Sequence, residues 1–168
     1  MELLSRFWSD SWVGQGHFVL AAIALILGPL IFTQRKGTAM HRGFGYAYLT
    51  AMLVVNVTAL TMYDMTRGPN LFHFFAVVSL GTITPGLIAI LRGSLTSHYF
   101  FMSWSYFGLL AAFLSQIATQ TGGVPKLAQA LGGASGFAIV FIGTGLAGFG
   151  ASRLINAKAK ELLPRYKA

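Results

Sequence analysis

Five long apolar segments, separated by short polar stretches, account for most of the chain. They extend approximately over residues 12–34, 41–63, 71–91, 98–119 and 127–152. Each has about 20 residues or more, the length that an α-helix needs to cross the hydrocarbon core of a bilayer. The pattern predicts an all-α membrane protein with five transmembrane helices. We expect one integral membrane domain over residues 1–168, ending in a basic tail at 153–168.

The composition agrees with a membrane location and narrows the chemistry. Of the 168 residues, 55% are hydrophobic and only 10% are charged, with a mean hydropathy of +0.65. Soluble domains carry about 25% charged residues. We therefore expect the lipid bilayer as a partner and no separate soluble catalytic module. Cysteine is absent, which excludes Fe–S ligation and thioether attachment of haem.

Lysine and arginine are distributed unequally between the two sides of these segments. The loop 35–42, the loop 92–97 and the tail carry nine of them, whereas the alternate ends carry Arg6, Arg67 and Lys126. The positive-inside rule then predicts an inner (plasma) membrane protein with its N-terminus outside and its C-terminal tail in the cytoplasm. Because the basic residues lie at segment ends, the net charge of +8 does not indicate a nucleic-acid partner.

The four histidines, His17, His41, His73 and His98, lie one near the start of each of the first four segments. Because alternate spans run in opposite directions, His17 and His73 are predicted near the outer face, and the other two near the inner face. Ionisable side chains in spans are rare and point to function, and imidazole is a good axial ligand of haem iron. The layout predicts a four-helix core holding two non-covalent b haems, with His17/His73 on the outer and His41/His98 on the inner one.

The neighbours of His41 add to this hypothesis. Gly45 lies one helical turn further on and would let a macrocycle approach the backbone, and Arg42 could pair with haem propionates. At 100° per residue, His41 shares a face with Tyr48 and Met52. The candidate cofactor-binding residues are therefore His17, His41, His73, His98, Arg42 and Gly45, and the four histidines are also the candidate metal ligands.

Two further features predict contacts between helices. Asn56 lies in the middle of the second segment, and we expect it to hydrogen-bond to a neighbouring helix. By the same projection, His73 is expected to share its face with Val77 and Thr84. The fifth segment has no histidine but contains Gly132-x-x-x-Gly136, a close-packing pattern. It could pack on its own bundle, form a homodimer or join a larger membrane complex.

Two resemblances extend this interpretation. The stretch His41-Arg-Gly-Phe-Gly-Tyr46, then Phe72-His73, then Arg92 leading to His98-Tyr-Phe-Phe-Met102 resembles a bacterial family of integral membrane proteins of unknown function, over residues of about 15–120. The histidine layout also resembles the transmembrane cytochrome b561 type. That resemblance implies electron transfer through two haems, each held by one histidine from each of two alternate helices.

Three functions remain open from the sequence. The first is a small di-haem b-type cytochrome, an electron-transfer oxidoreductase component with a quinone or a redox protein as its partner. The second is a cofactor-free accessory subunit of a larger respiratory or photosynthetic complex. The third is a transporter of metal ions or small solutes that uses histidine pairs. The haem content of the purified protein separates the first function from the other two.

Overall fold

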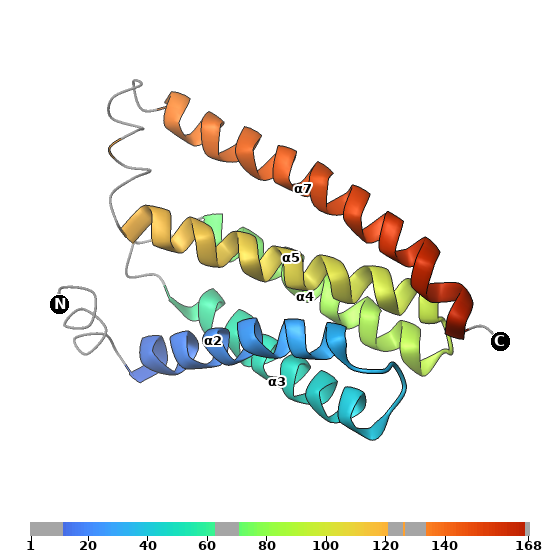
Figure 1. Ribbon diagram of the computed structural model, residues 1–168. Coiled ribbons are helices and arrows are strands. Elements are labelled where there is room, and N and C mark those ends of the chain that lie inside the picture. The colour runs from blue at the N-terminus through green and yellow to red at the C-terminus, as the bar shows by residue number, and fades with distance from the viewer. Residues whose placement is uncertain (1–11, 63–70, 121–125, 127–133, 167–168) are drawn as a thin grey trace. The chain divides into compact units, whose positions relative to one another are not determined.

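The computed structural model describes residues 12–62, 71–120, 126 and 134–166 (Figure 1). The chain forms α2 (Trp12–Thr33), α3 (Ala39–Thr61), α4 (Leu71–Leu91), α5 (Leu95–Gln120) and α7 (Ala134–Leu162), and then the short 3-10 helix η1 (Leu163–Tyr166). The predicted all-α class is confirmed over these residues. The first four predicted spans agree with α2 to α5 to within a few residues, because charged or glycine-containing turns separate them.

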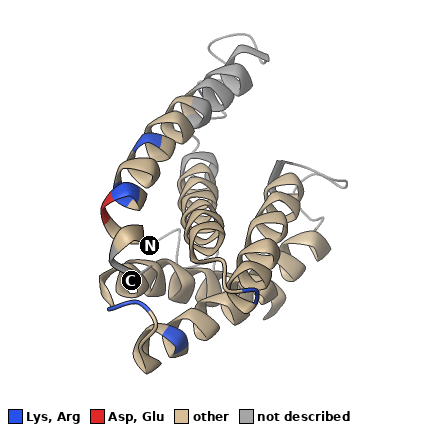
Figure 2. Ribbon diagram, turned by 90° about the vertical axis from the view of Figure 1, so that its right-hand side faces the viewer, with Lys and Arg blue, Asp and Glu red and all other residues tan. Residues whose placement is uncertain are grey.

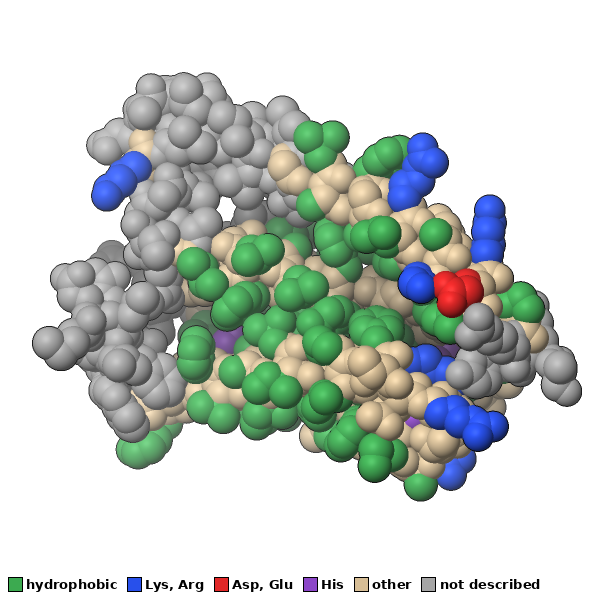
Figure 3. Space-filling model, in the orientation of Figure 1, with side chains coloured by type: hydrophobic (Ala, Val, Ile, Leu, Met, Phe, Trp, Pro, Cys, Tyr) green, Lys and Arg blue, Asp and Glu red, His purple; other side chains and the backbone are tan. Residues whose placement is uncertain are grey.

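Four helices are long and apolar enough to cross a membrane. They are α2, α3, residues His73–Leu91 of α4 and residues Leu95–Ile117 of α5. Large hydrophobic side chains remain exposed along them, among them Ile26 (64%), Val77 (58%) and Leu114 (62%). Figure 3 shows such side chains covering the visible surfaces of the helices. A surface of this kind is suited to contact with lipid tails rather than water.

The fifth predicted span, residues 127–152, is not supported. α7 begins at Ala134 and continues ten residues beyond the predicted end, to Leu162. Within the described residues it is not among the helices that meet the length and hydropathy needed to cross a membrane. The first half of α7 is uncharged as far as Ser152, and its basic residues begin at Arg153. Gly132, the first residue of the predicted close-packing pattern, lies outside the described residues.

The described residues fall into two compact units, divided within α4 between Thr84 and Pro85. The first unit contains α2, α3 and most of α4. The second contains the end of α4 together with α5, α7 and η1. Pro85 lies inside α4 and removes one backbone donor from the helix, so the division coincides with a local weakness of that helix. A single domain over the whole chain stays a prediction.

The first unit is organised around an antiparallel hairpin of α2 and α3 (Figure 1). Gly37 turns the chain between them with a φ of +80°, which glycine adopts without strain. Lys36 closes α2 by donating from Nζ to the carbonyl oxygens of Ile31 and Phe32, both at 2.9 Å, so two terminal carbonyls are satisfied. Burial lowers the pKa of the Lys36 ammonium below its usual value.

Burial in this unit confirms the predicted helix face of His41 and corrects the predicted face of His73. Tyr48 and Met52, predicted on the face of His41, are 4% and 2% exposed. Val77 and Thr84, predicted on the face of His73, are both exposed, so that prediction was wrong. The buried positions of α4 instead include Ala76 and Ile83, at 3% and 4%, which lie two helical turns apart on a face shifted by one residue from Val77 and Thr84.

Asn56 joins α3 to α4 inside this unit. It is 5% exposed, and its Nδ2 donates to the carbonyl oxygen of Met52 at 2.7 Å and to Ser79 Oγ at 3.0 Å. The predicted hydrogen bond between helices is therefore confirmed. In a hydrocarbon environment an amide without partners would be costly, so this pair also sets the register of α3 against α4.

The second unit begins with the turn between α4 and α5. Ser94 N–H donates to the Ala89 carbonyl oxygen at 2.8 Å, and Gly93 N–H to that of Ile90 at 3.0 Å. With Gly93 at a φ of +77°, these two bonds form a Schellman cap. The turn is therefore short and tightly hydrogen-bonded, which leaves little slack between the two helices.

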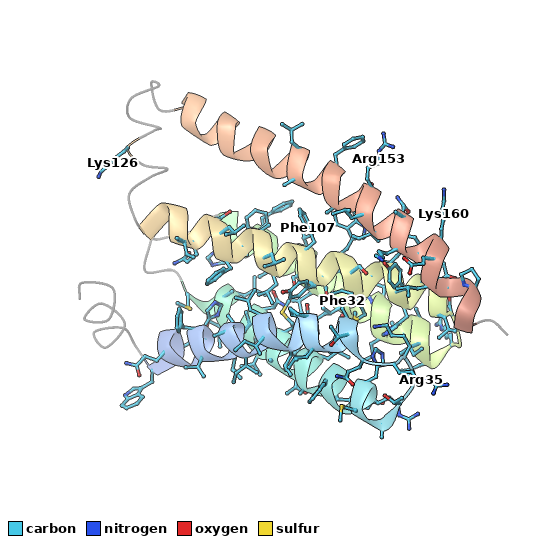
Figure 4. The ribbon with its side chains drawn as sticks, in the orientation of Figure 1. Phe32, Arg35, Phe107, Lys126, Arg153 and Lys160 are labelled. Carbon is cyan, nitrogen blue, oxygen red and sulfur yellow. The ribbon has the colours of Figure 1, made fainter. Side chains whose placement is uncertain are left out.

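α7 runs antiparallel to α5 within the second unit (Figure 1). Tyr99 Oη donates to the Ile155 carbonyl oxygen at 3.2 Å, and Phe107 points from α5 towards α7 (Figure 4) near Gly148. Along α7, charged residues occupy the second half of the helix (Figure 2). There the Arg153 guanidinium lies 5.2 Å from the centre of the Phe149 ring.

Replacing Asn56 by alanine should lower the free energy of unfolding by about 1 kcal/mol, because a buried hydrogen bond between membrane helices is lost. Ser79→Ala should cost less, and the double variant should cost less than the sum, since both side chains share one bond. Unfolding in mixed detergent micelles, followed by circular dichroism, measures all three. Val57→Ala, at an exposed site on α3, is the control, and strictly additive costs would contradict the prediction.

Candidate functional site

Each of the four histidines lies in the first two turns of its helix. His17 is the sixth residue of α2, His41 and His73 are the third residues of α3 and α4, and His98 is the fourth residue of α5. His73 is buried, with 7% of its surface exposed, and the other three are half-buried.

The ring of His17 is held by a threonine of the neighbouring helix. His17 Nδ1 lies 2.8 Å from Thr58 Oγ1. The Thr58 hydroxyl donates its single proton to the carbonyl oxygen of Val54 at 2.8 Å, with that of Val55 at 3.0 Å. When that proton goes to a carbonyl oxygen, Thr58 accepts from His17, and Nδ1 then carries the proton of the neutral ring. The lone pair of His17 is then on Nε2.

The ring of His98 also has its proton on Nδ1, but its hydrogen-bond acceptor is a main-chain carbonyl. Its Nδ1 lies 2.9 Å from the carbonyl oxygen of Gly86, across the turn between α4 and α5. A carbonyl oxygen can only accept, so Nδ1 of His98 must donate, and Nε2 again holds the lone pair. Ligating histidines in proteins are oriented in this manner, by a hydrogen bond from the second ring nitrogen.

His17 and His73 lie at similar depths in the first unit. The hydrogen bond to Thr58 places His17 at the level of residue 58 of α3. The bond between Asn56 and Ser79 places His73, six residues before Ser79 in the antiparallel α4, at about the level of residue 62. The difference of four residues corresponds to about 6 Å along the helix axis. The two predicted outer histidines are therefore within about one turn of each other in depth.

His41 lies at the opposite end of α3 from these groups. Its backbone N–H donates to Thr38 Oγ1 at 3.2 Å, so Thr38 caps α3 and holds the first turn in place. Arg42 is exposed, and Gly45, one turn further on, is half-buried. A Cβ added at Gly45 would meet no atom within 4 Å, so there is space beside the backbone at this point.

The structure does not gather the four histidines into one cluster. Within the described ranges, no three His, Cys, Asp or Glu side chains are placed to share a metal ion. His17, His41 and His73 belong to the first unit and His98 to the second.

Sequence reasoning missed the two groups that orient the histidines, Thr58 and Gly86. A signal for both was present in the short turns. In an antiparallel hairpin whose turn is centred near residue 37 or 38, position 17 faces position 58. By the same arithmetic, a turn centred near residue 92 brings position 98 opposite position 86. Hydropathy alone could not show this, since it locates segments but not their register.

These observations define a helical membrane protein with several apolar helices and histidines at their ends. The chain belongs to the family described as predicted membrane protein DUF2306, whose profile matches residues 14–143. No curated protein and no solved structure shows a detectable match to the chain. The predicted resemblance to a family of integral membrane proteins of unknown function is confirmed, and the likeness to the cytochrome b561 type remains one of histidine layout.

Replacing Thr58 by valine should release His17 from the Nδ1–H form, because valine keeps the shape of threonine but offers no acceptor. Stability should fall by about 1 kcal/mol. Thr58→Ser should preserve both the Nδ1–H form of His17 and the stability of the protein. Nitrogen-15 NMR of the imidazole side chains in detergent measures the tautomer, with His98 as the internal control. An unchanged His17 signal in the valine variant would show that Thr58 does not set the tautomer.

Proposed function

We propose that the protein is a small di-haem b-type cytochrome that transfers electrons across or within the membrane. The observation that carries this proposal is the common protonation pattern of His17 and His98. Each donates Nδ1–H to an acceptor on the adjacent helix and keeps Nε2 as a lone-pair donor. Nε2 is the atom through which imidazole ligates iron when Nδ1 is engaged in this manner.

The chain's residues fit haem better than a free metal ion. Porphyrin supplies the equatorial ligands of the iron, so two imidazoles complete the set and no larger cluster is needed. His17 and His73, at similar depth, would hold the outer haem, and His41 and His98 the inner one. Gly45 leaves room beside the backbone, and the exposed Arg42 is placed to pair with propionates. When bound, haem supplies one-electron exchange.

The surroundings of the histidines suit a membrane electron carrier. The helices are apolar, and the neutral imidazole is the form that ligates iron. The four acidic residues of the sequence offer few carboxylates for proton-coupled transport. A quinone dissolved in the bilayer, or a redox protein at its surface, would then exchange electrons with the haem edges.

The purified protein, produced with ample haem, should show b-type absorption bands that sharpen on reduction with dithionite, at about two haems per chain. Either His17→Ala or His73→Ala should remove the same half of the haem, and His41→Ala or His98→Ala the other half. Quantified haem with reduced-minus-oxidised spectra measures this. Val77→Ala, an exposed change one turn from His73, is the matched control.

Three outcomes would contradict the proposal. A folded protein that stays colourless would favour the cofactor-free accessory subunit, with the histidines as packing residues whose replacement lowers stability alone. Stoichiometric zinc or copper in place of haem would favour the transporter. Loss of all haem from every histidine variant, with folding intact, would support one shared haem rather than two.

We further propose that α7 crosses the membrane as a fifth span, with the N-terminus outside and the C-terminal tail in the cytoplasm. Two contacts with α5 support this: Tyr99 with Ile155, and Phe107 near Gly148. They run in antiparallel order along a helix that is itself long enough to span. An odd number of spans also places the basic second half of α7 on the same side as Arg35 and Arg92, as the positive-inside rule requires.

Single cysteines test this topology directly, because the chain has none of its own. In spheroplasts, Lys126→Cys should react with a membrane-impermeant maleimide. Lys160→Cys should react only after the membrane is permeabilised, as should Met40→Cys in the first turn of α3. All three replaced side chains are exposed. If α7 does not cross the membrane, positions 126 and 160 will react from the same side.

A further inference from the structure

Gly86 occupies a place in the second unit where an added side chain would be crowded by α5. It is buried in α4, and its backbone is helical, so the requirement for glycine is one of space and not of conformation. A Cβ built there would overlap Met102 Cε and would lie 3.1 Å from Phe101 Cβ. The methionine tip is flexible, but the phenylalanine Cβ is fixed to the backbone of α5. Any side chain at position 86 therefore presses α5 away from α4.

The same residue supplies the acceptor for His98. His98 and Met102 are one turn apart on α5, so both look towards the α4 backbone at Gly86. The hydrogen bond from His98 Nδ1 to the Gly86 carbonyl oxygen is 2.9 Å long. The Schellman cap at Gly93 and Ser94 leaves the turn short. Because the turn has little slack, a displacement of α5 changes the distance between α4 and α5 at the hydrogen bond between His98 and Gly86.

We propose that Gly86 is a positioning residue for His98. Its missing side chain allows α5 to approach until the carbonyl oxygen fixes His98 with the proton on Nδ1 and the lone pair on Nε2. Met102 fills the space above the glycine and thereby maintains the distance between the helices. Any consequence of Gly86 for haem ligation rests on the proposed function. Its effect on the orientation and tautomer of the His98 ring does not.

The test compares the wild-type apoprotein with Gly86→Ala by nitrogen-15 NMR of the histidine side chains in detergent. The wild type should show His98 in a single Nδ1–H form. Gly86→Ala should convert it to a mixture of tautomers and leave His17 unchanged. Alanine has the higher helix propensity, so a weaker helix α4 cannot be the cause. Gly81→Ala and Gly108→Ala, where an added Cβ would meet nothing within 4 Å, are the matched controls.

A second substitution provides the rescue. Met102→Ala removes the atoms that the new methyl would overlap, so the double variant Gly86→Ala/Met102→Ala should recover the single His98 form. The remaining contact with Phe101 needs a shift of only a few tenths of an ångström. If Gly86→Ala alone does not fold, recovery of both folding and the His98 signal in the double variant supports the proposal.

Two results would overturn it: an unchanged His98 tautomer in folded Gly86→Ala, or a double variant that shows no recovery. Haem content is then measured on the same proteins. If Gly86→Ala alters the His98 tautomer but the protein never binds haem, the positioning role of Gly86 is supported and the proposed cytochrome function is refuted. In a protein that binds haem, Gly86→Ala should lower the occupancy of the inner site and leave that of the outer site unchanged.

Discussion

The need of every polar group for a partner within the protein governs this structure more than any other constraint. In a hydrocarbon environment there is no water to replace a missing hydrogen bond. The ring of His17 meets this need through Thr58, that of His98 through the Gly86 carbonyl, and the amide of Asn56 through Ser79. Each of these bonds joins two helices, so these polar side chains also set the helix registers.

This coupling holds the rings of His17 and His98 in place through contacts within the protein alone. A hydrogen bond consumes one nitrogen of each oriented ring and directs the other away from the bonded helix. The orientation is then a property of the helix pair and exists before any ligand arrives. Preorganisation of this kind reduces the entropy lost when a ligand binds, which matters in a small bundle with little packing energy to spare.

The elements of the fold were largely predictable from the sequence. The bounds of α4, residues 71–91, were anticipated because a polar turn precedes it and Arg92 follows it. α7 differs from the predicted 127–152 because it begins at Ala134 and continues through basic residues to Leu162, and hydropathy alone does not mark where a helix ends. The prediction at Asn56 succeeded because a mid-span amide has few options besides another helix.

The environment of the candidate site was less predictable. Which residues face one another depends on turn length and helix rotation, and a period of 3.6 residues leaves steps of three and four nearly equivalent. That ambiguity misplaced Val77 and Thr84 on the buried side of α4, where Ala76 and Ile83 lie instead. Thr58 and Gly86 carried no chemical signal of their own, since threonine and glycine are common in membrane helices.

The two oriented histidines differ in how mutation can reach them. The acceptor for His98 is a main-chain atom, which every amino acid possesses, so no exchange of a functional group can delete it. The acceptor for His17 is a hydroxyl on a side chain, which a single codon change can remove, weaken or replace. Variation among descendants of this chain can therefore adjust the first imidazole by chemistry, but the second only through the spacing of two helices.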